Sequence, residues 1–175
     1  MKDRPEALIS AEEISRRVAE MGREITQDFE GKQLTLVGVL KGAFVFMADL
    51  IRHISLPLHC DFLRVNSYDA HGQSSTIRLE FDLTQPIEGQ HVLLIEDILD
   101  TGKTLHFILS HLRTKNPASL TVCCLLDKGL NPDLAKEVRY VGFKAPRSYL
   151  VGYGLDLAGE YRELPYVARV DLKKP

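Results

Sequence analysis

Three short runs of apolar residues constrain the fold of this chain more than any other feature of its sequence. The runs are LTLVGVL at 34–40, VLLI at 92–95 and LTVCCLL at 120–126. Each has the length of a strand and lacks polar alternation, which predicts strands buried on both faces of a sheet. AFVFMADLIRHI and TLHFILSHL, each of helical length, follow the first two runs. This alternation predicts an α/β fold, with a mainly parallel sheet and helices on both faces.

The flanking segments predict an additional helix and a hairpin beside the sheet. Residues 10–13 have the pattern of a capping box at the start of a helix. Apolar residues then follow at helical spacing: Ile14, Val18, Met21 and Ile25. The stretches LHCDFLRVN (58–66) and IRLEFDL (77–83) predict strands, and the polar stretch between them predicts a mobile loop. We therefore expect a hairpin-like, flexible flap over about 64–82.

Length and composition indicate one globular domain over residues 1–175. With 45% hydrophobic and 26% charged residues, the chain is too apolar for disorder. The net charge of -2 gives no reason to expect nucleic acid or an acidic membrane surface as a partner. No apolar run approaches the length of a membrane span, and MKDRPEALIS lacks the apolar core of a signal peptide. We expect a cytoplasmic protein.

The three cysteines show neither a disulfide framework nor a zinc site. No C-x-x-C arrangement is present, and three thiols cannot all pair. Cys123 and Cys124 are adjacent in an apolar run, where a strand would point them to opposite faces. We expect buried, unpaired thiols in a reducing compartment.

The stretch VLLIEDILDTGKT at 92–104 carries the residues most suited to chemistry. Glu96 and Asp97 follow a buried strand, and ligands of open α/β sheets bind outside the carboxyl ends of strands. Residues 100–104 predict a turn into a helix, whose free amides and positive dipole end suit a phosphate. Two carboxylates would repel a triphosphate, but they accept hydrogen bonds from sugar hydroxyls. The stretch therefore predicts a sugar-phosphate site, which a magnesium ion can share.

Two other interpretations of this stretch compete with a sugar-phosphate site. A Walker A loop also ends in GKT, but it requires glycine at position 97, where this chain has Asp97. A purely structural role is the second, because Asp is a good N-cap residue and Asp100 could simply cap the helix. Glu96 and Asp97 would then merely end a strand.

IEDILDTGKT resembles the phosphoribosyl-diphosphate signature of the type I phosphoribosyltransferases. Further matches are LKGAF at 40–44, DFLRVNSY at 61–68, LLDK at 125–128 and VGFKAPRSYLVGYGLDLAGEYRELPYV at 141–167. They cover most of the chain and narrow the resemblance to the hypoxanthine-guanine phosphoribosyltransferases. The resemblance implies the type I phosphoribosyltransferase fold, with a small C-terminal hood at about 141–170 that covers the purine.

The resemblance also implies an activity in purine salvage. The 5-phosphoribosyl group of phosphoribosyl diphosphate would pass to N9 of hypoxanthine or guanine, with release of pyrophosphate. Glu96 and Asp97 would hold the ribose hydroxyls, in part through Mg²⁺. Asp100 would be the general base and face N7 of the purine. The 5-phosphate would lie on the loop formed by Asp100, Thr101, Gly102, Lys103 and Thr104.

Pyrophosphate binding is implied for two separate segments. Leu40, Lys41 and Gly42 match the family's pyrophosphate loop, in which a cis peptide precedes the lysine. Asp156 matches the family's second magnesium ligand, and Arg162 matches an arginine that contacts pyrophosphate. Without the resemblance, these would be an ordinary turn, a turn aspartate and a surface arginine.

Purine recognition and the flap are implied at five further positions. Lys128 aligns with the lysine that contacts the 6-oxo group, and a donor-only ammonium there disfavours adenine. Tyr149 stands where the family stacks an aromatic ring on the purine, and the backbone of Leu150 would contact the edge of the base. Ser67 and Tyr68 resemble the start of the family's flap, which shields the reacting centre from water.

Alternatives to this activity are a xanthine-preferring transferase, a pyrimidine transferase and a non-catalytic regulator that senses phosphoribosyl diphosphate. The expected hood argues against pyrimidines but not against xanthine. Asp100 and the mildly acidic net charge argue against a regulator, which typically loses the base or gains a basic face. The resemblance implies a homodimer or homotetramer whose partners are small-molecule substrates, with no nucleic acid and no membrane.

Overall fold

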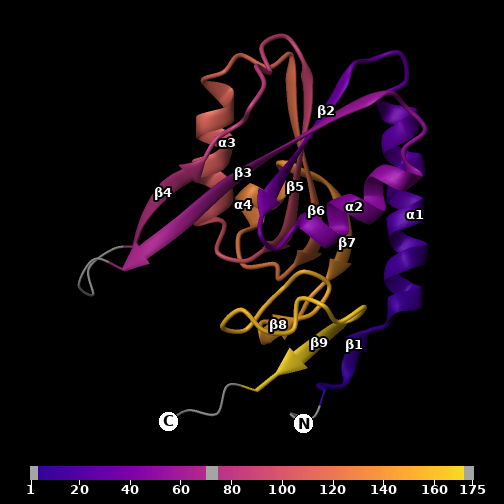
Figure 1. Ribbon diagram of the computed structural model, residues 1–175, viewed down its shortest axis with the longest axis vertical. Coiled ribbons are helices and arrows are strands. Elements are labelled where there is room, and N and C mark those ends of the chain that lie inside the picture. The colour runs from indigo at the N-terminus through magenta and orange to yellow at the C-terminus, as the bar shows by residue number, and fades with distance from the viewer. Residues whose placement is uncertain (1–3, 70–74, 172–175) are drawn as a thin grey trace.

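The computed structural model describes residues 4–69 and 75–171, and for residues 67–69, 75, 76 and 135 it describes the backbone alone. The elements in chain order are β1 (Ala7–Ile9), α1 (Ala11–Asp28), β2 (Leu34–Leu40), α2 (Phe44–Leu50), a 3-10 helix (Ile51–His53), β3 (Leu58–Asp69), β4 (Ser75–Phe81), β5 (His91–Leu99), α3 (Lys103–Arg113), β6 (Ser119–Asp127), α4 (Pro132–Ala135), β7 (Val138–Lys144), β8 (Tyr149–Val151) and β9 (Val167–Val170). Figure 1 shows their arrangement.

A six-stranded sheet forms the centre of the fold. Its strand order is β4-β3-β2-β5-β6-β7, and every pair is parallel except β3 with β4. The three apolar runs of the sequence lie in β2, β5 and β6, which are adjacent inner strands. The predicted α/β fold with a mainly parallel sheet is therefore confirmed.

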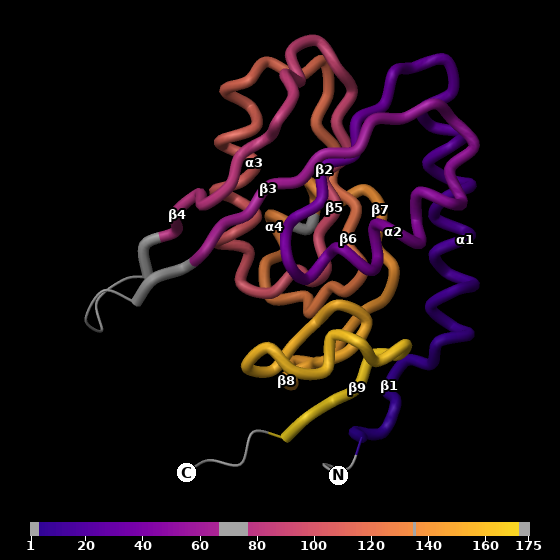
Figure 2. Tube along the Cα trace, in the orientation of Figure 1, coloured from indigo at the N-terminus to yellow at the C-terminus, as the bar shows by residue number. Residues whose placement is uncertain are grey.

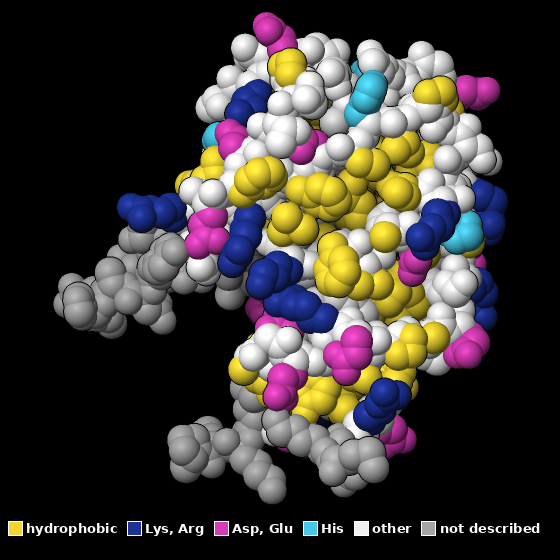
Figure 3. All heavy atoms as spheres, in the orientation of Figure 1, with side chains coloured by type: hydrophobic (Ala, Val, Ile, Leu, Met, Phe, Trp, Pro, Cys, Tyr) yellow, Lys and Arg dark blue, Asp and Glu magenta, His cyan; other side chains and the backbone are white. Residues whose placement is uncertain are grey.

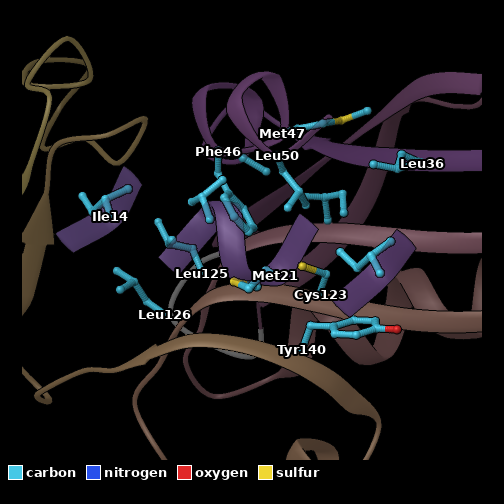
Figure 4. Close-up of a cluster of buried hydrophobic side chains, with 14 of the residues drawn as sticks. Ile14, Met21, Leu36, Phe46, Met47, Leu50, Cys123, Leu125, Leu126 and Tyr140 are labelled. Atoms are coloured by element: carbon cyan, nitrogen blue, oxygen red, sulfur yellow. The ribbon is translucent and has the colours of Figure 1, made fainter. Parts of the chain in front are cut away.

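Helices cover both faces of this sheet. On one face, α1 and α2 bury their apolar side chains against β2, β5 and β6 (Figure 4). On the other face, α3 and α4 pack against the same strands. Cys123 belongs to the first core and Cys124 to the second, as their adjacent positions in a strand predict. The expectation of buried thiols is wrong for Cys60, which is exposed near the start of strand β3.

Both hydrogen bonds of the predicted capping box are present at the start of α1. The amide of Glu13 donates to Oγ of Ser10 at 3.2 Å, and the amide of Ser10 donates to Oε2 of Glu13 at 2.9 Å. The second helix is shorter than its twelve-residue sequence pattern indicates, because α2 ends at Leu50 and continues as the 3-10 helix. The first residues of α2 lie beside the site described below.

The β3–β4 hairpin projects from one edge of the sheet (Figure 2). Its antiparallel register runs from Arg64 opposite Phe81 to Asp69 opposite Ser75, so much of the predicted loop is ladder. Residues 70–74, part of the predicted flap, lie outside the described residues. At the base of the hairpin, the carboxylate of Asp82 contacts His111 of α3 at 3.0 Å and Lys115, two residues after α3, at 2.8 Å.

The hood is a second, three-stranded antiparallel sheet of order β1-β9-β8. It lies below the carboxyl ends of the parallel strands in Figure 1. The sequence analysis missed that β1, from the N-terminus, belongs to this sheet, while residues 141–144 of the expected hood lie in β7. Across the described ranges, no helix is long and apolar enough to span a membrane.

Candidate active site

The acidic pair lies within strand β5 and not after it, because pairing with β6 continues to Leu99 opposite Asp127. The side chain of Glu96 points into the protein, where the residue is only 7% exposed. Its Oε2 atom has no hydrogen-bond partner among the described residues. A buried carboxylate oxygen without a donor is costly, so this atom indicates a missing cation or hydroxyl donor.

Both acids have raised pKa values. Burial, followed by the neighbouring charge of Asp97, raises the pKa of Glu96 well above its usual range. Burial raises the pKa of Asp97 to about 6, although the amide of Ile98 and the guanidinium of Arg162 act in the opposite direction. Two adjacent carboxylates held in this way favour a ligand that supplies positive charge or donor hydroxyls.

The turn after β5 forms a small cavity at the start of α3. Gly102 is the N-cap residue with φ +81°, and a Cβ atom there would lie 2.3 Å from Cδ2 of Leu134. The first amides of a helix have no partner within the helix, so those after Gly102 are available to a ligand. The cavity has a volume of about 180 Å³ and is lined by Glu96 and the 100–104 turn. Anion-binding amides and acids therefore border one space.

Asp100 does not cap this helix, so the helix-cap interpretation of this residue is wrong. The N-cap is Gly102, which provides no side-chain hydrogen bond. Instead, Oδ2 of Asp100 accepts from Nζ of Lys128 at 2.8 Å. The Lys128 side chain is only 10% exposed, whereas that of Asp100 is 46% exposed. The candidate base and the candidate purine-binding lysine are thus neighbours at the ends of β5 and β6.

The turn between β2 and α2 packs against the acidic pair. The peptide between Leu40 and Lys41 is cis, as the resemblance implies. A Cβ atom on Gly42 would lie 1.7 Å from Oδ2 of Asp97, so only glycine fits there. A Cβ atom on Gly154 would lie 2.2 Å from the carbonyl oxygen of Gly42. The candidate pyrophosphate loop is therefore enclosed between strand β5 and the hood.

The hood places its two charged candidate residues, Asp156 and Arg162, near the acidic pair of β5. Nη1 of Arg162 donates to the carbonyl oxygen of Gly154 at 2.5 Å, and its Nη2 contacts Oδ1 of Asp156 at 2.6 Å. The hydroxyl of Tyr149 donates to the carbonyl oxygen of Asp156 at 3.1 Å. The Tyr149 ring is 40% exposed, whereas Leu150 is buried. An exposed ring beside buried backbone suits stacking on a planar ligand.

The remaining predicted site residues are less constrained. Lys41, Thr101 and Lys103 are exposed on the two turns. Ser67 and Tyr68 lie near the end of β3, and their side chains are outside what the structure describes. In Figure 3, Lys and Arg side chains gather beside the notch between the hairpin and the hood. This positive charge suits an anionic ligand.

Sequence reasoning missed three residues that shape the site. Asn131 donates to the carbonyl oxygen of Thr101 at 3.2 Å and caps α4, so it supports the phosphate turn. The Asn-Pro pair at the start of α4 was a detectable helix-start pattern. Asp127 accepts from the amide of Gly129 at 2.8 Å and from Lys144, and it therefore shapes the turn that carries Lys128. Gly154 had no local signal, because its role depends on tertiary contacts.

The described residues contain no cluster of three or more His, Cys, Asp or Glu side chains arranged to hold a metal ion. Glu96, Asp97 and Asp156 thus do not form a closed metal cage. Magnesium is commonly bound by one or two carboxylates together with substrate phosphates, so an open donor set is compatible with it.

Comparison with known proteins gives the family. A family model described as the phosphoribosyl transferase domain matches residues 6–157. A hypoxanthine-guanine phosphoribosyltransferase of Dictyostelium discoideum is 46% identical over 170 residues, with 94% of each chain covered. A hypoxanthine phosphoribosyltransferase of Salmonella typhimurium is 43% identical over 176 residues, with 98% of each chain covered.

Solved structures agree with the sequence matches. The crystal structure of a hypoxanthine phosphoribosyltransferase from Staphylococcus aureus aligns with a TM-score of 0.88 at 42% identity, covering 95% of this chain and 91% of that chain. A ternary substrates complex of a mutant hypoxanthine phosphoribosyltransferase from Trypanosoma cruzi aligns with a TM-score of 0.86 at 35% identity, covering 94% of each chain. The chain therefore belongs to the phosphoribosyltransferase family, and within it to the hypoxanthine-guanine phosphoribosyltransferases.

Proposed function

We propose that the chain is a purine-salvage transferase that joins the 5-phosphoribosyl group of phosphoribosyl diphosphate to N9 of hypoxanthine or guanine. The C1–N9 bond forms, the bond from C1 to pyrophosphate breaks, and pyrophosphate leaves with the electron pair. The products are IMP or GMP and pyrophosphate. The observation that carries this proposal is the buried acid pair, with its unpartnered Glu96 oxygen, beside the open amides of α3.

The ribose and its phosphate would occupy the stretch from Glu96 to Thr104. Glu96 and Asp97 accept hydrogen bonds from the ribose diol, which separates their charge from that of the phosphate. Thr101, Gly102, Lys103 and Thr104 provide amides, hydroxyls and one ammonium group for the 5-phosphate. The cavity lined by Glu96, Thr101, Gly102 and Thr104 supports this assignment.

The purine would bind between the ends of β5 and β6 and the hood. Asp100 accepts the proton that the ring loses at N7, a role typically worth about 10²–10⁴-fold in rate. Lys128 donates to the 6-oxo group, and Tyr149 stacks on the ring. The backbone of Leu150 contacts the edge of the base. The contact between Asp100 and Lys128 supports the proposal, since one 6-oxopurine presents N7 and O6 side by side.

Pyrophosphate would be held from two sides, by Leu40, Lys41 and Gly42 and by Arg162 of the hood. The close approach of Gly42 to Asp97 supports the loop's role, because it places the backbone of the loop beside the acid pair. Ser67 and Tyr68 would belong to the flap that covers the reacting carbon.

Magnesium fits this donor set. Glu96, Asp97 and Asp156 offer carboxylate oxygens, the ligands that Mg²⁺ prefers, and Oε2 of Glu96 has no described partner. When bound, the ion would neutralise charge on the pyrophosphate. Thermal unfolding with phosphoribosyl diphosphate, with and without Mg²⁺, tests the requirement independently of turnover. We expect the larger rise in midpoint with both present.

We further propose that the phosphoribosyltransferase domain spans residues 1–175, with a flap at about 64–82, and that the protein is a cytoplasmic homodimer or homotetramer. In a solved hypoxanthine phosphoribosyltransferase of Trypanosoma cruzi, the C-terminal region has a role in the oligomeric state and in the enzymatic activity. Sedimentation analysis of this chain would give the assembly directly.

Steady-state assays with hypoxanthine, guanine, xanthine and adenine test the proposed function. We expect turnover of hypoxanthine or guanine, little of adenine, and a large loss in the Asp100→Asn variant. Preference for xanthine would indicate the alternative transferase. Binding of phosphoribosyl diphosphate without turnover of any purine would indicate a regulator.

A further inference from the structure

The groups proposed to bind pyrophosphate come from two parts of the fold, the loop before α2 and the hood. We propose that the hydrogen bond between Tyr153 and Asp49 positions these two parts against each other. This inference rests on the proposed function. Neither residue belongs to the substrate-binding set described above, so the pair would act through Lys41 and Arg162.

Tyr153 reaches from the hood to α2. The residue is 5% exposed, and its hydroxyl donates to Oδ2 of Asp49 at 2.7 Å. The other carboxylate oxygen, Oδ1, accepts from Nη1 of Arg52 at 3.0 Å. Burial, followed by the hydrogen bond to Asp49, raises the pKa of Tyr153, so its hydroxyl stays a donor at neutral pH.

The backbone around Tyr153 is held firmly in the hood. Tyr153 has φ +50°, and its amide donates to the carbonyl oxygen of Leu164 at 2.9 Å. The next amide, of Gly154, donates to the carbonyl oxygen of Arg162 at 3.1 Å, and the Arg162 side chain returns to the Gly154 carbonyl. A shift of Tyr153 would therefore move the guanidinium of Arg162.

Two contacts between the hood and the segment from Gly42 to Asp49 lie at opposite ends of that segment. Gly154 lies against the carbonyl oxygen of Gly42, and Tyr153 bonds to Asp49. Asp49 lies seven positions after Gly42, which is on the order of 10 Å at the helical rise of 1.5 Å per residue. Two contacts that far apart fix an orientation as well as a distance. Removing one of them would leave the orientation of the hood to apolar packing alone, since Tyr153 and Leu155 belong to the same core cluster as α2.

Helix α2 is a rigid connection between those contacts. Phe46, Met47 and Leu50 are buried in the core between α1 and the sheet (Figure 4). The loop at the start of α2 moves with this helix. The hydrogen bond from Tyr153 to Asp49 therefore fixes the hood relative to the loop as well as to the helix. Small misplacement matters here, since about 1 Å at a reacting group can cost 10²-fold in rate.

The chain contains a matched control pair far from the site. The hydroxyl of Tyr140 in β7 donates to Oδ2 of Asp28 in α1 at 2.6 Å, and Arg139 contacts the same oxygen at 2.8 Å. Tyr140 is 3% exposed, so burial and chemistry match those of Tyr153. Loss of this hydroxyl should lower stability alone.

The experiment compares Tyr153→Phe, Asp49→Ala, Asp49→Asn, the Tyr153→Phe/Asp49→Ala double variant and Tyr140→Phe with the unmodified enzyme. Three quantities are measured: KM for phosphoribosyl diphosphate, KM for hypoxanthine, and the affinity for pyrophosphate with Mg²⁺ by calorimetry. Thermal midpoints report the structural cost of each change.

We expect Tyr153→Phe to raise KM for phosphoribosyl diphosphate about 10-fold and to weaken pyrophosphate binding similarly, with KM for hypoxanthine changed less than about twofold. The double variant should resemble the single ones, because both remove one interaction. Asp49→Asn keeps an acceptor oxygen and should retain most of the affinity. Tyr140→Phe should lower the midpoint without moving either KM.

Equal shifts in Tyr153→Phe and Tyr140→Phe, or equal changes in both KM values, would overturn the inference. If the unmodified chain turns over no purine while Tyr153→Phe still weakens pyrophosphate binding, the proposed function fails and the positioning role stands. If turnover is normal and no variant changes affinity, only the positioning role fails.

Discussion

Two neighbouring strands, β5 and β6, carry buried acids whose pKa values are shifted in opposite directions. Glu96 near the end of β5 is 7% exposed, and Asp127 at the end of β6 is 2% exposed. Glu96 has an oxygen without a described partner and a strongly raised pKa. Asp127 is paired with Lys144 and the amide of Gly129, and these contacts lower its pKa despite its burial.

We interpret this difference as the difference between a proposed binding group and a structural one. Both residues have little solvent exposure, so low exposure alone does not identify a site. Asp127 has its charge satisfied within the chain and holds the turn that carries Lys128. Oε2 of Glu96 has no such partner among the described residues, and a ligand can supply one. The β5 turn would therefore carry binding and chemistry, whereas the β6 turn would carry support.

The largest expected effect is on turnover when Asp100 in the β5 turn is changed. Asp100→Asn removes the proposed proton acceptor, and we expect kcat to fall by about 10²–10⁴-fold. KM for phosphoribosyl diphosphate should change little. Steady-state kinetics with hypoxanthine provide the measurement. A similar fall in kcat for Asp127→Asn would remove the distinction between the two turns.

A smaller effect is expected on affinity when Glu96 is neutralised. Glu96→Gln removes a charged acceptor, and hydrogen bonds to charged groups correspond to about 10- to 100-fold in affinity. KM for phosphoribosyl diphosphate should rise accordingly, while the ligand-free protein should lose no stability. Urea unfolding without ligand checks the second part. A marked loss of stability would mean that Glu96 is structural.

Asp127→Ala should reverse this pattern. The amide of Gly129 loses its acceptor, so we expect the free energy of unfolding to fall by roughly 1–3 kcal/mol. Lys144→Ala is the matched control, and it should cost at most about 1 kcal/mol because the Lys144 side chain is 76% exposed. Thermal or urea unfolding gives both values. A smaller loss in Asp127→Ala than in Lys144→Ala would contradict the proposed support.

The smallest expected effect is a difference between Glu96→Gln and Asp127→Asn in how stability depends on pH. The folded pKa of Asp127 is lowered, so its stabilisation exists above the unfolded value of 3.8 and is lost as pH falls through the folded pKa. The folded pKa of Glu96 is raised, so its charge lowers stability increasingly as pH rises above 4.5. As pH rises, the stability of Glu96→Gln should thus increase relative to that of the unmodified protein, and the stability of Asp127→Asn should decrease relative to it. Urea unfolding across roughly pH 2–8 measures both trends, and parallel trends would refute the contrast.

Much of the fold was predictable because its central strands are continuous apolar runs. Those runs, the capping box of α1 and the opposite directions of Cys123 and Cys124 depend on local periodicity. The extension of β5 beyond its apolar run was not predictable, since pairing with β6 sustains it. The joining of β1 to the hood also depends on a partner distant in sequence.

The candidate site was predictable only in its contiguous part. The stretch from Glu96 to Thr104 indicated a sugar-phosphate site from its own chemistry. Lys41, Lys128 and Arg162 were identified through the resemblance, because each alone is an unremarkable cation. The contacts of Gly42 with Asp97 and Gly154 arise from folding, and no local pattern encodes them.

The crystal structure of the protein with phosphoribosyl diphosphate and Mg²⁺ tests the central claim most directly. We expect the ribose hydroxyls within hydrogen-bond distance of Glu96 and Asp97 or of a magnesium ion that these residues hold. The 5-phosphate should lie on the amides that follow Asp100. Asp127 should keep its contacts with Lys144 and Gly129. Ligand density elsewhere, with Oε2 of Glu96 still unpartnered, would contradict the account.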